Sequence, residues 1–168
     1  GEHYTISDMK GRPKPVQAGG PPLVVGGGGK RVLSTAARLA DIVGVNPNVG
    51  EGKFGPVAAA SMSADATEQK LGWIRDAAGD RFGDIEISIL KFVTIVTDDR
   101  DDMAGKVGAA MGMDAATALA CPHMLIGSAE QIADELIEQR ERWQGSYVTV
   151  QSDAIDTFAP IVAALAGT

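Results

Sequence analysis

The first chemistry suggested by this sequence is phosphate binding by a run of four glycines. Residues 26–29 are all glycine, and Lys30 and Arg31 follow them directly. Glycines after a strand let the backbone approach an anion closely, and the free N–H groups at the start of the next helix attract negative charge. Lys30 or Arg31 can add a charge-assisted contact. The alternative is a tight turn between a strand and a helix, with both basic side chains solvated.

The two common nucleotide-binding templates do not fit this run. In the P-loop pattern, Arg31 stands where a magnesium-binding Ser or Thr is required, and Val24 stands where the first glycine belongs. In the dinucleotide pattern G-x-G-x-x-G, the third glycine falls on Arg31 or Val32. Asn46 and Pro47 end the following strand, where that pattern needs an acidic residue. What remains is the general way of binding an anion, with a glycine turn before the start of a helix.

Other residues of chemically active types have plainer interpretations. His123 suits loop packing better than acid–base catalysis, and Lys91 either meets an anion at a strand end or reaches solvent from there. Lys53 and Phe54 lie in a long loop where substrate contacts would fall. The acidic cluster at residues 98–102 suits the positive end of a helix better than a metal. No Ser-His-Asp or Cys-His set can be assembled, so any chemistry belongs to a cofactor.

The elements that position these residues alternate between strands and helices. Apolar runs predict buried strands at residues 23–25, 42–45, 85–96 and 147–150. Helical spacing predicts helices at residues 30–40, from 63–65 onward, from Thr97 onward, from the capping box Ser128-x-x-Gln131 to about Trp143, and at 153–166. Residues 48–62 form a long irregular segment. This alternation predicts an α/β fold of parallel βα units, and four such units are half of a (β/α)8 barrel.

Composition narrows the possible partners. The chain of 168 residues has a net charge of −7, which argues against nucleic acid because phosphate backbones need clustered Lys and Arg. Cys121 is the only cysteine, so no disulfide can form within the chain, and we expect a cytoplasmic protein without a metal site. No apolar run approaches the ~20 residues that span a bilayer, so we expect no membrane partner.

Several strings of the sequence, in a fixed order, carry a family resemblance. They are PxPVQxxxPPLVVGGGGKRVLxxAARLADIVGVNP, AAGDRFGDIEISIL, KFVTIV, PHMLIGSAEQIADELIEQRERWQGSYVTV and DTFAPIVAALAG. Together they resemble the luciferase-like monooxygenase superfamily, in its branch of coenzyme F420-dependent oxidoreductases. The resemblance covers nearly the whole chain, and the glycine segment and LIGSAEQIADEL are its most specific parts.

The resemblance implies a (β/α)8 barrel with the cofactor across the C-terminal ends of the strands. The cofactor would be F420, or alternatively FMN, and it would exchange a hydride with a small organic substrate. The residues implied to hold its phosphate are Gly27, Gly28, Gly29, Lys30 and Arg31. Asn46, at the end of the next strand, is implied to line the same site.

Only the C-terminal half of such a barrel, about strands 5–8, has a counterpart in this sequence. We therefore expect residues 1–20 to form an extended arm and residues 21–168 to form a half-barrel domain. Two exposed parallel edge strands would invite pairing. The expected partner is a missing N-terminal half-barrel or a second copy in a homodimer, and the isolated chain should be inactive without it. A half-barrel that serves only in binding or assembly is the alternative.

Overall fold

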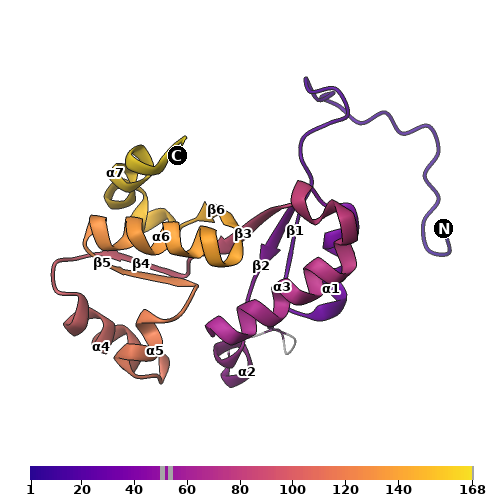
Figure 1. Cartoon of the computed structure of the whole chain (residues 1–168). Coiled ribbons are helices and arrows are strands. Elements are labelled where there is room, and N and C mark those ends of the chain that lie inside the picture. Colours follow the sequence, from indigo (N-terminus) through magenta and orange to yellow (C-terminus); the bar gives the residue numbers. More distant parts are fainter. Residues whose placement is uncertain (50–51, 53–54, 168) are drawn as a thin grey trace.

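The computed structural model describes residues 1–49, 52 and 55–167. Residues 1–20 contain neither helix nor strand and extend away from the rest of the molecule (Figure 1). None of the helices in the described part of the chain is both long and apolar enough to cross a membrane.

A parallel four-stranded sheet forms the centre of the fold. Its strands are β1 (Val24–Gly27), β2 (Ile42–Val45), β3 (Glu86–Leu90) and β6 (Gly145–Thr149), in the order β1-β2-β3-β6. Every neighbouring pair is parallel. This arrangement confirms the predicted fold class of parallel βα units. The strands of the described residues do not close a barrel, in agreement with half of one.

Helices cover one face of this sheet. Helix α1 (Lys30–Leu39) packs against α3 (Ala64–Ala78), and both lie beside β1 and β2 (Figure 1). A 3-10 helix, η1 (Gly79–Asp84), continues from α3. The main apolar core lies between these helices and the sheet; it is Leu33, Ala36, Ala37, Ala40, Val43, Val45, Leu71, Ile74, Ile85, Ile87, Ile89 and Trp143.

The opposite face of the sheet remains partly open. Strand residues alternate between faces, so Val24 lies on the face away from Val25, which packs against the core. Val24 is 54% exposed and Tyr147, opposite Ser88 in the register, is 44% exposed. The two edge strands, β1 and β6, each pair with a single neighbour among the described residues.

One predicted strand was wrong. Residues 85–96 form two strands, β3 and β4 (Val93–Val96), which belong to different sheets because the backbone changes partner between them. The N–H of Lys91 donates to the carbonyl of Thr149 at 2.9 Å, whereas the N–H of Phe92 donates to the carbonyl of His123 at 2.8 Å. The sequence of this mostly apolar segment does not indicate that the backbone changes partner after Lys91.

The second sheet pairs β4 with β5 (Met124–Gly127) in parallel. It lies beside α6 (Ala129–Trp143), with α4 (Arg100–Met111) and α5 (Ala115–Leu119) on its other side (Figure 1). The capping box of α6 is confirmed: Ser128 accepts from the N–H of Gln131, and the Gln131 side chain accepts from the N–H of Ser128.

Several element boundaries differ from the prediction, and three of the differences affect the description of the fold. Strand β1 includes the first two glycines of the run, so only Gly28 and Gly29 form the turn. The segment predicted to be irregular contains a short helix, α2 (Pro56–Ala60). The last helix, α7 (Ile155–Leu165), follows a 3-10 turn, η2 (Ser152–Ala154).

Candidate functional site

The glycine turn and Asn46 lie together at the carboxyl ends of β1 and β2. The N–H of Asn46 donates to the carbonyl of Gly27 at 3.0 Å, directly after the last paired residues of the two strands. A side chain at Gly26 would begin 2.8 Å from Nδ2 of Asn46. The structure thus brings the predicted residues of β1, α1 and β2 into one place.

Most of the glycines are required by close contacts within the chain. A Cβ at Gly28 would lie 2.2 Å from the carbonyl oxygen of Pro47, and a Cβ at Gly27 would lie 2.5 Å from the Val32 side chain. A Cβ at Gly29, in contrast, would meet no atom within 4 Å. Among the described residues, Gly29 is therefore the one member of the run that faces open space. Gly26 and Gly28 allow close approach to the residues that follow β2, and Gly27 leaves room for the Val32 side chain of α1.

The start of α1 has the features of an anion site. Its first N–H groups lack helical acceptors, as in any helix, and no side chain caps them. Helices α3 and α6 are capped by Ser63 and Ser128, and α4 and α7 carry acidic residues in their first turns. The first turn of α1 has no acid, and its exposed basic residues are Lys30 and Arg31.

Lys91 is neither at an open mouth nor in contact with solvent, so both interpretations from the sequence were wrong. Its side chain is 1% exposed, and its ammonium group donates to the carbonyl of Pro122 at 2.6 Å and to Oε1 of Gln139. Burial lowers the pKa of Lys91 to about 8, although nearby Glu135 opposes the shift. The ammonium group holds the chain where β3 ends and β4 begins.

The polar contacts continue from Gln139 along α6. Nε2 of Gln139 donates to Oε1 of Glu135 at 3.1 Å, and the other oxygen of Glu135 lies 3.5 Å from Arg100 at the start of α4. Burial raises the pKa of Glu135 to about 7, while Lys91 and Arg100 act in the opposite direction. We call Lys91, Pro122, Gln139, Glu135 and Arg100 the Lys91 network.

His123 packs inside the protein, as the sequence predicted. It is fully buried, its Nδ1 lies 2.9 Å from the carbonyl oxygen of Leu90, and its ring packs against Phe92. Burial lowers the pKa of His123 to about 4. Cys121 is also buried, and burial raises the pKa of its thiol. Neither group has the exposure or the titration expected of an acid, a base or a nucleophile at neutral pH.

Sequence reasoning missed Lys70, which is 2% exposed. Its ammonium group donates to the carbonyls of Asn46 at 2.9 Å and Ser61 at 2.5 Å, and burial lowers its pKa to about 8. A signal was present in the sequence: Thr67, Lys70, Leu71 and Ile74 have helical spacing, so Lys70 occupies a core position of α3. Lys70 fixes the loop that packs against the glycine turn.

Two other sets of predicted residues are Lys53 with Phe54 and the acidic cluster at residues 98–102. Lys53 and Phe54 lie outside the described residues. Asp99 occupies the N-cap position before α4, and Asp101 and Asp102 lie in the first turn of that helix. The described residues contain no group of three or more His, Cys, Asp or Glu side chains that would hold a metal ion.

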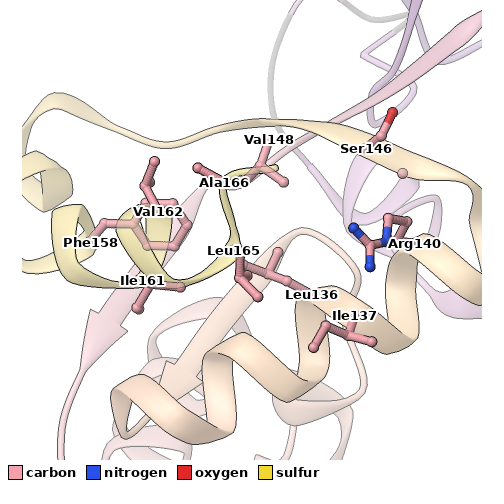
Figure 2. A pocket seen from close by; sticks show the side chains of 11 residues that line it. Leu136, Ile137, Arg140, Ser146, Val148, Phe158, Ile161, Val162, Leu165 and Ala166 are labelled. Atoms are coloured by element: carbon pink, nitrogen blue, oxygen red, sulfur yellow. The ribbon is translucent and has the colours of Figure 1, made fainter. Parts of the chain in front are cut away.

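An apolar groove of about 250 Å³ lies away from the glycine turn, between α6, α7 and β6. Leu136, Leu165 and Phe158 contribute to its walls, and Arg140 and Ser146 lie at one end (Figure 2). It adjoins the opposite edge of the sheet from β1 and contains none of the predicted site residues.

Three solved structures show a similar fold at low sequence identity. An F420-dependent secondary alcohol dehydrogenase in complex with an F420-acetone adduct matches 98% of this chain, with 15% identity and a TM-score of 0.59. An EDTA monooxygenase from Chelativorans sp. BNC1 matches 98%, with 14% identity and a TM-score of 0.61. A riboflavin lyase with modified FMN and riboflavin matches 87%, with 14% identity and a TM-score of 0.53.

The matched regions are 54%, 48% and 43% of those three chains, so this chain spans about half of their length. No curated protein matches the sequence significantly. The family described as luciferase-like monooxygenase has a model that matches residues 1–168. Because that match covers the whole sequence, the chain belongs to the luciferase-like monooxygenase family.

Proposed function

We propose that this chain is the cofactor-phosphate-binding half of an F420-dependent oxidoreductase, which transfers a hydride between the deazaflavin and a small organic substrate. The observation that carries the proposal is the open start of α1, directly after the glycine turn and at the carboxyl ends of parallel strands. In barrels of this class, ligands bind at that end of the strands. Both F420 and FMN carry a phosphate, so FMN is the alternative cofactor.

The residues present fit a phosphate group. Gly29 leaves open space, and the N–H groups of the first turn of α1 have no acid or cap beside them. Gly28 lets the turn pack against the loop after β2, and Gly27 leaves room for the Val32 side chain of α1. Lys30 and Arg31 supply positive charge. The bound cofactor would supply the hydride chemistry, and this chain would bind and orient it.

A partner is part of the proposal. The open sheet face with Val24 and Tyr147, and the two free edge strands, suit a missing N-terminal half-barrel that completes the cylinder. A second copy of this chain is the other candidate. We propose that catalysis requires this completion, because the groups around the reacting ring would come from the partner.

The competing function is a half-barrel that binds or assembles without catalysis. The same open face and edges favour it, since they provide an assembly surface whether or not a cofactor binds. The two functions differ in one measurable property, which is affinity for F420 or FMN.

Fluorescence polarisation of F420 and of FMN tests the proposal. We expect weak binding by the chain that strengthens when the N-terminal half of a luciferase-like relative is added. The Lys30→Ala/Arg31→Ala variant should bind about tenfold more weakly, because two solvent-exposed charged contacts of about 0.7 kcal/mol each contribute about 1.4 kcal/mol together. Lys10→Ala/Lys14→Ala, with the same charge change in the exposed arm, is the control. Binding of neither cofactor, with or without the added half, would support the assembly module instead.

A further inference from the structure

A second hollow, of about 430 Å³, lies between the start of α3 and the region that joins α4 to α5. One wall runs from Ala59 through Met62 to Asp65. The other includes Met111, Met113 and Cys121. We call this hollow the methionine pocket. Its volume lies within the range of about 300–1,000 Å³ that is typical of small-molecule sites.

The buried lining residues of the methionine pocket belong to a distinct apolar cluster. Met62 and Cys121 line the pocket and cluster with Met124 behind them, and each of the three is at most 4% exposed. Met111 and Met113 are partly buried and pack against this cluster. Methionine side chains are unbranched and adaptable, so they accommodate flexible apolar molecules of different shapes. This composition favours an aliphatic ligand over a rigid polar one.

Two of the polar groups in the wall, the Ser63 hydroxyl and the Cys121 thiol, already make hydrogen bonds within the chain. The Ser63 hydroxyl caps α3 by accepting from the N–H of Ala66 at 3.2 Å. The thiol of Cys121 donates to the carbonyl of Met62 at 3.5 Å. Among the described residues that line the pocket, Asp65 is the only charged one, and none is a Lys or Arg that could bind an anion. An anionic ligand would therefore be repelled.

The methionine pocket is linked to the same end of the sheet as the glycine turn. The N–H of Asn48 donates to the Ser61 hydroxyl at 2.7 Å, and Lys70 bridges the carbonyls of Asn46 and Ser61. Ser61 directly precedes Met62 in the pocket wall. These bonds place the pocket beside the carboxyl ends of the strands, separate from the glycine turn itself.

We propose that the methionine pocket binds an uncharged, flexible, mainly aliphatic molecule. Binding at this pocket does not require a cofactor at the glycine turn. The proposal can therefore be tested independently of the function proposed above. It differs also from the groove between α6 and α7, which lies against β6.

Methyl NMR of the methionines tests this proposal with 1-octanol as the probe. The chain has six methionines, of which Met62, Met111 and Met113 line the pocket. We expect saturable shifts of those three ε-methyl signals in protein labelled with ¹³C-methyl methionine. Met9, in the extended arm, and Met103, near the start of α4, should not move. Unchanged pocket signals, or equal shifts of all six, would overturn the proposal.

A variant that fills the pocket gives a matched comparison. Ala120→Trp places a large ring at the exposed rim, and Ala116→Trp places the same ring on an exposed position of α5 outside the lining. We expect octanol to bind Ala120→Trp at least tenfold more weakly, and Ala116→Trp like the unmodified chain. Equal affinity in both variants would place the ligand elsewhere.

Two further measurements test whether the pocket prefers an uncharged ligand and whether a second copy of the chain occupies it. Octanoate should bind at least tenfold more weakly than octanol because of Asp65, and equal binding would contradict the preference for an uncharged ligand. Methionine shifts that change with protein concentration in the absence of octanol would identify a second copy of the chain as the occupant, and would also overturn the proposal.

Discussion

The glycine turn and the Lys91 network both lie where a strand of the sheet ends, and both contain lysine. They are built in opposite ways. Lys30 is exposed beside uncapped backbone N–H groups, with no acid in the first turn of its helix. Lys91 is 1% exposed and fully engaged by a carbonyl and an amide. The position of a lysine at a strand end therefore does not by itself indicate ligand binding. Its burial and its hydrogen-bond partners within the chain decide whether the ammonium group is available to a ligand or stabilises the fold.

The largest effect should follow removal of the buried ammonium group. We expect Lys91→Met to lower the free energy of unfolding by about 3 kcal/mol, because the Pro122 carbonyl and the Gln139 amide oxygen lose their donor inside the protein. Urea unfolding measures the loss, with Lys14→Met in the exposed arm as the control. Adding Gln139→Leu should recover part of the stability, because it removes the Gln139 amide oxygen, which has lost its donor in Lys91→Met. Equal stability of Lys91→Met and the unmodified chain would show that the network is not structural.

The glycine turn offers a matched pair of substitutions. Gly28→Ala should cost about 2 kcal/mol, because the new Cβ would lie 2.2 Å from the Pro47 carbonyl oxygen and the backbone must move. Gly29→Ala should change stability by less than about 0.5 kcal/mol, since its Cβ meets no atom within 4 Å and its φ of −108° suits any residue. Urea unfolding of both variants gives the comparison. Equal losses would mean that the turn does not pack as described.

Stability should depend on pH through Glu135. Its pKa is raised from 4.5 to about 7 in the folded protein, so the folded state binds more protons between these values and stability falls as pH rises through this window. We expect a loss of about 1 kcal/mol, within the upper limit of about 3 kcal/mol that the full shift gives at about 1.36 kcal/mol per pKa unit. Unfolding measured from pH 4.5 to 7.5 should show a flatter profile for Glu135→Gln. The exposed Glu141→Gln, on the same helix, should retain the original slope.

The smallest effect is expected at the basic residues of the turn. Lys30→Ala/Arg31→Ala should alter the free energy of unfolding by less than about 0.5 kcal/mol, because both side chains are exposed. A thermal melt beside the cofactor titration separates stability from binding. A large loss of stability would show that these two residues, like the Lys91 network, stabilise the fold, and would argue against a role in ligand binding alone.

Local patterns predicted part of the fold closely. Residues 42–45 form β2 as expected, and Ser128 and Gln131 cap α6, because these features depend on neighbouring residues. The predicted single strand at residues 85–96 failed because Lys91 and Phe92 bond to different strands. Hydrophobic periodicity indicates which residues are buried, but it does not indicate which strand a backbone N–H or carbonyl group bonds to.

The candidate site was also only partly predictable. The sequence itself indicated the glycine run with Lys30 and Arg31, because glycine and basic residues before a helix have a local physical meaning. Lys70 stood in the apolar stripe of α3 but was not recognised, because a lysine at a core position is informative only if a partner is known. Its partners, the carbonyls of Asn46 and Ser61, are 24 and 9 residues away.

The sequence alone determined the alternation of strands and helices, the glycine turn and the charge beside it, since these follow from residue type and short-range spacing. The tertiary structure decided which of the four glycines faces open space, how Lys91 and Lys70 are buried, and where two sheets separate. The physical reason is that close approach, desolvation and hydrogen-bond partners depend on segments that meet only when the chain folds.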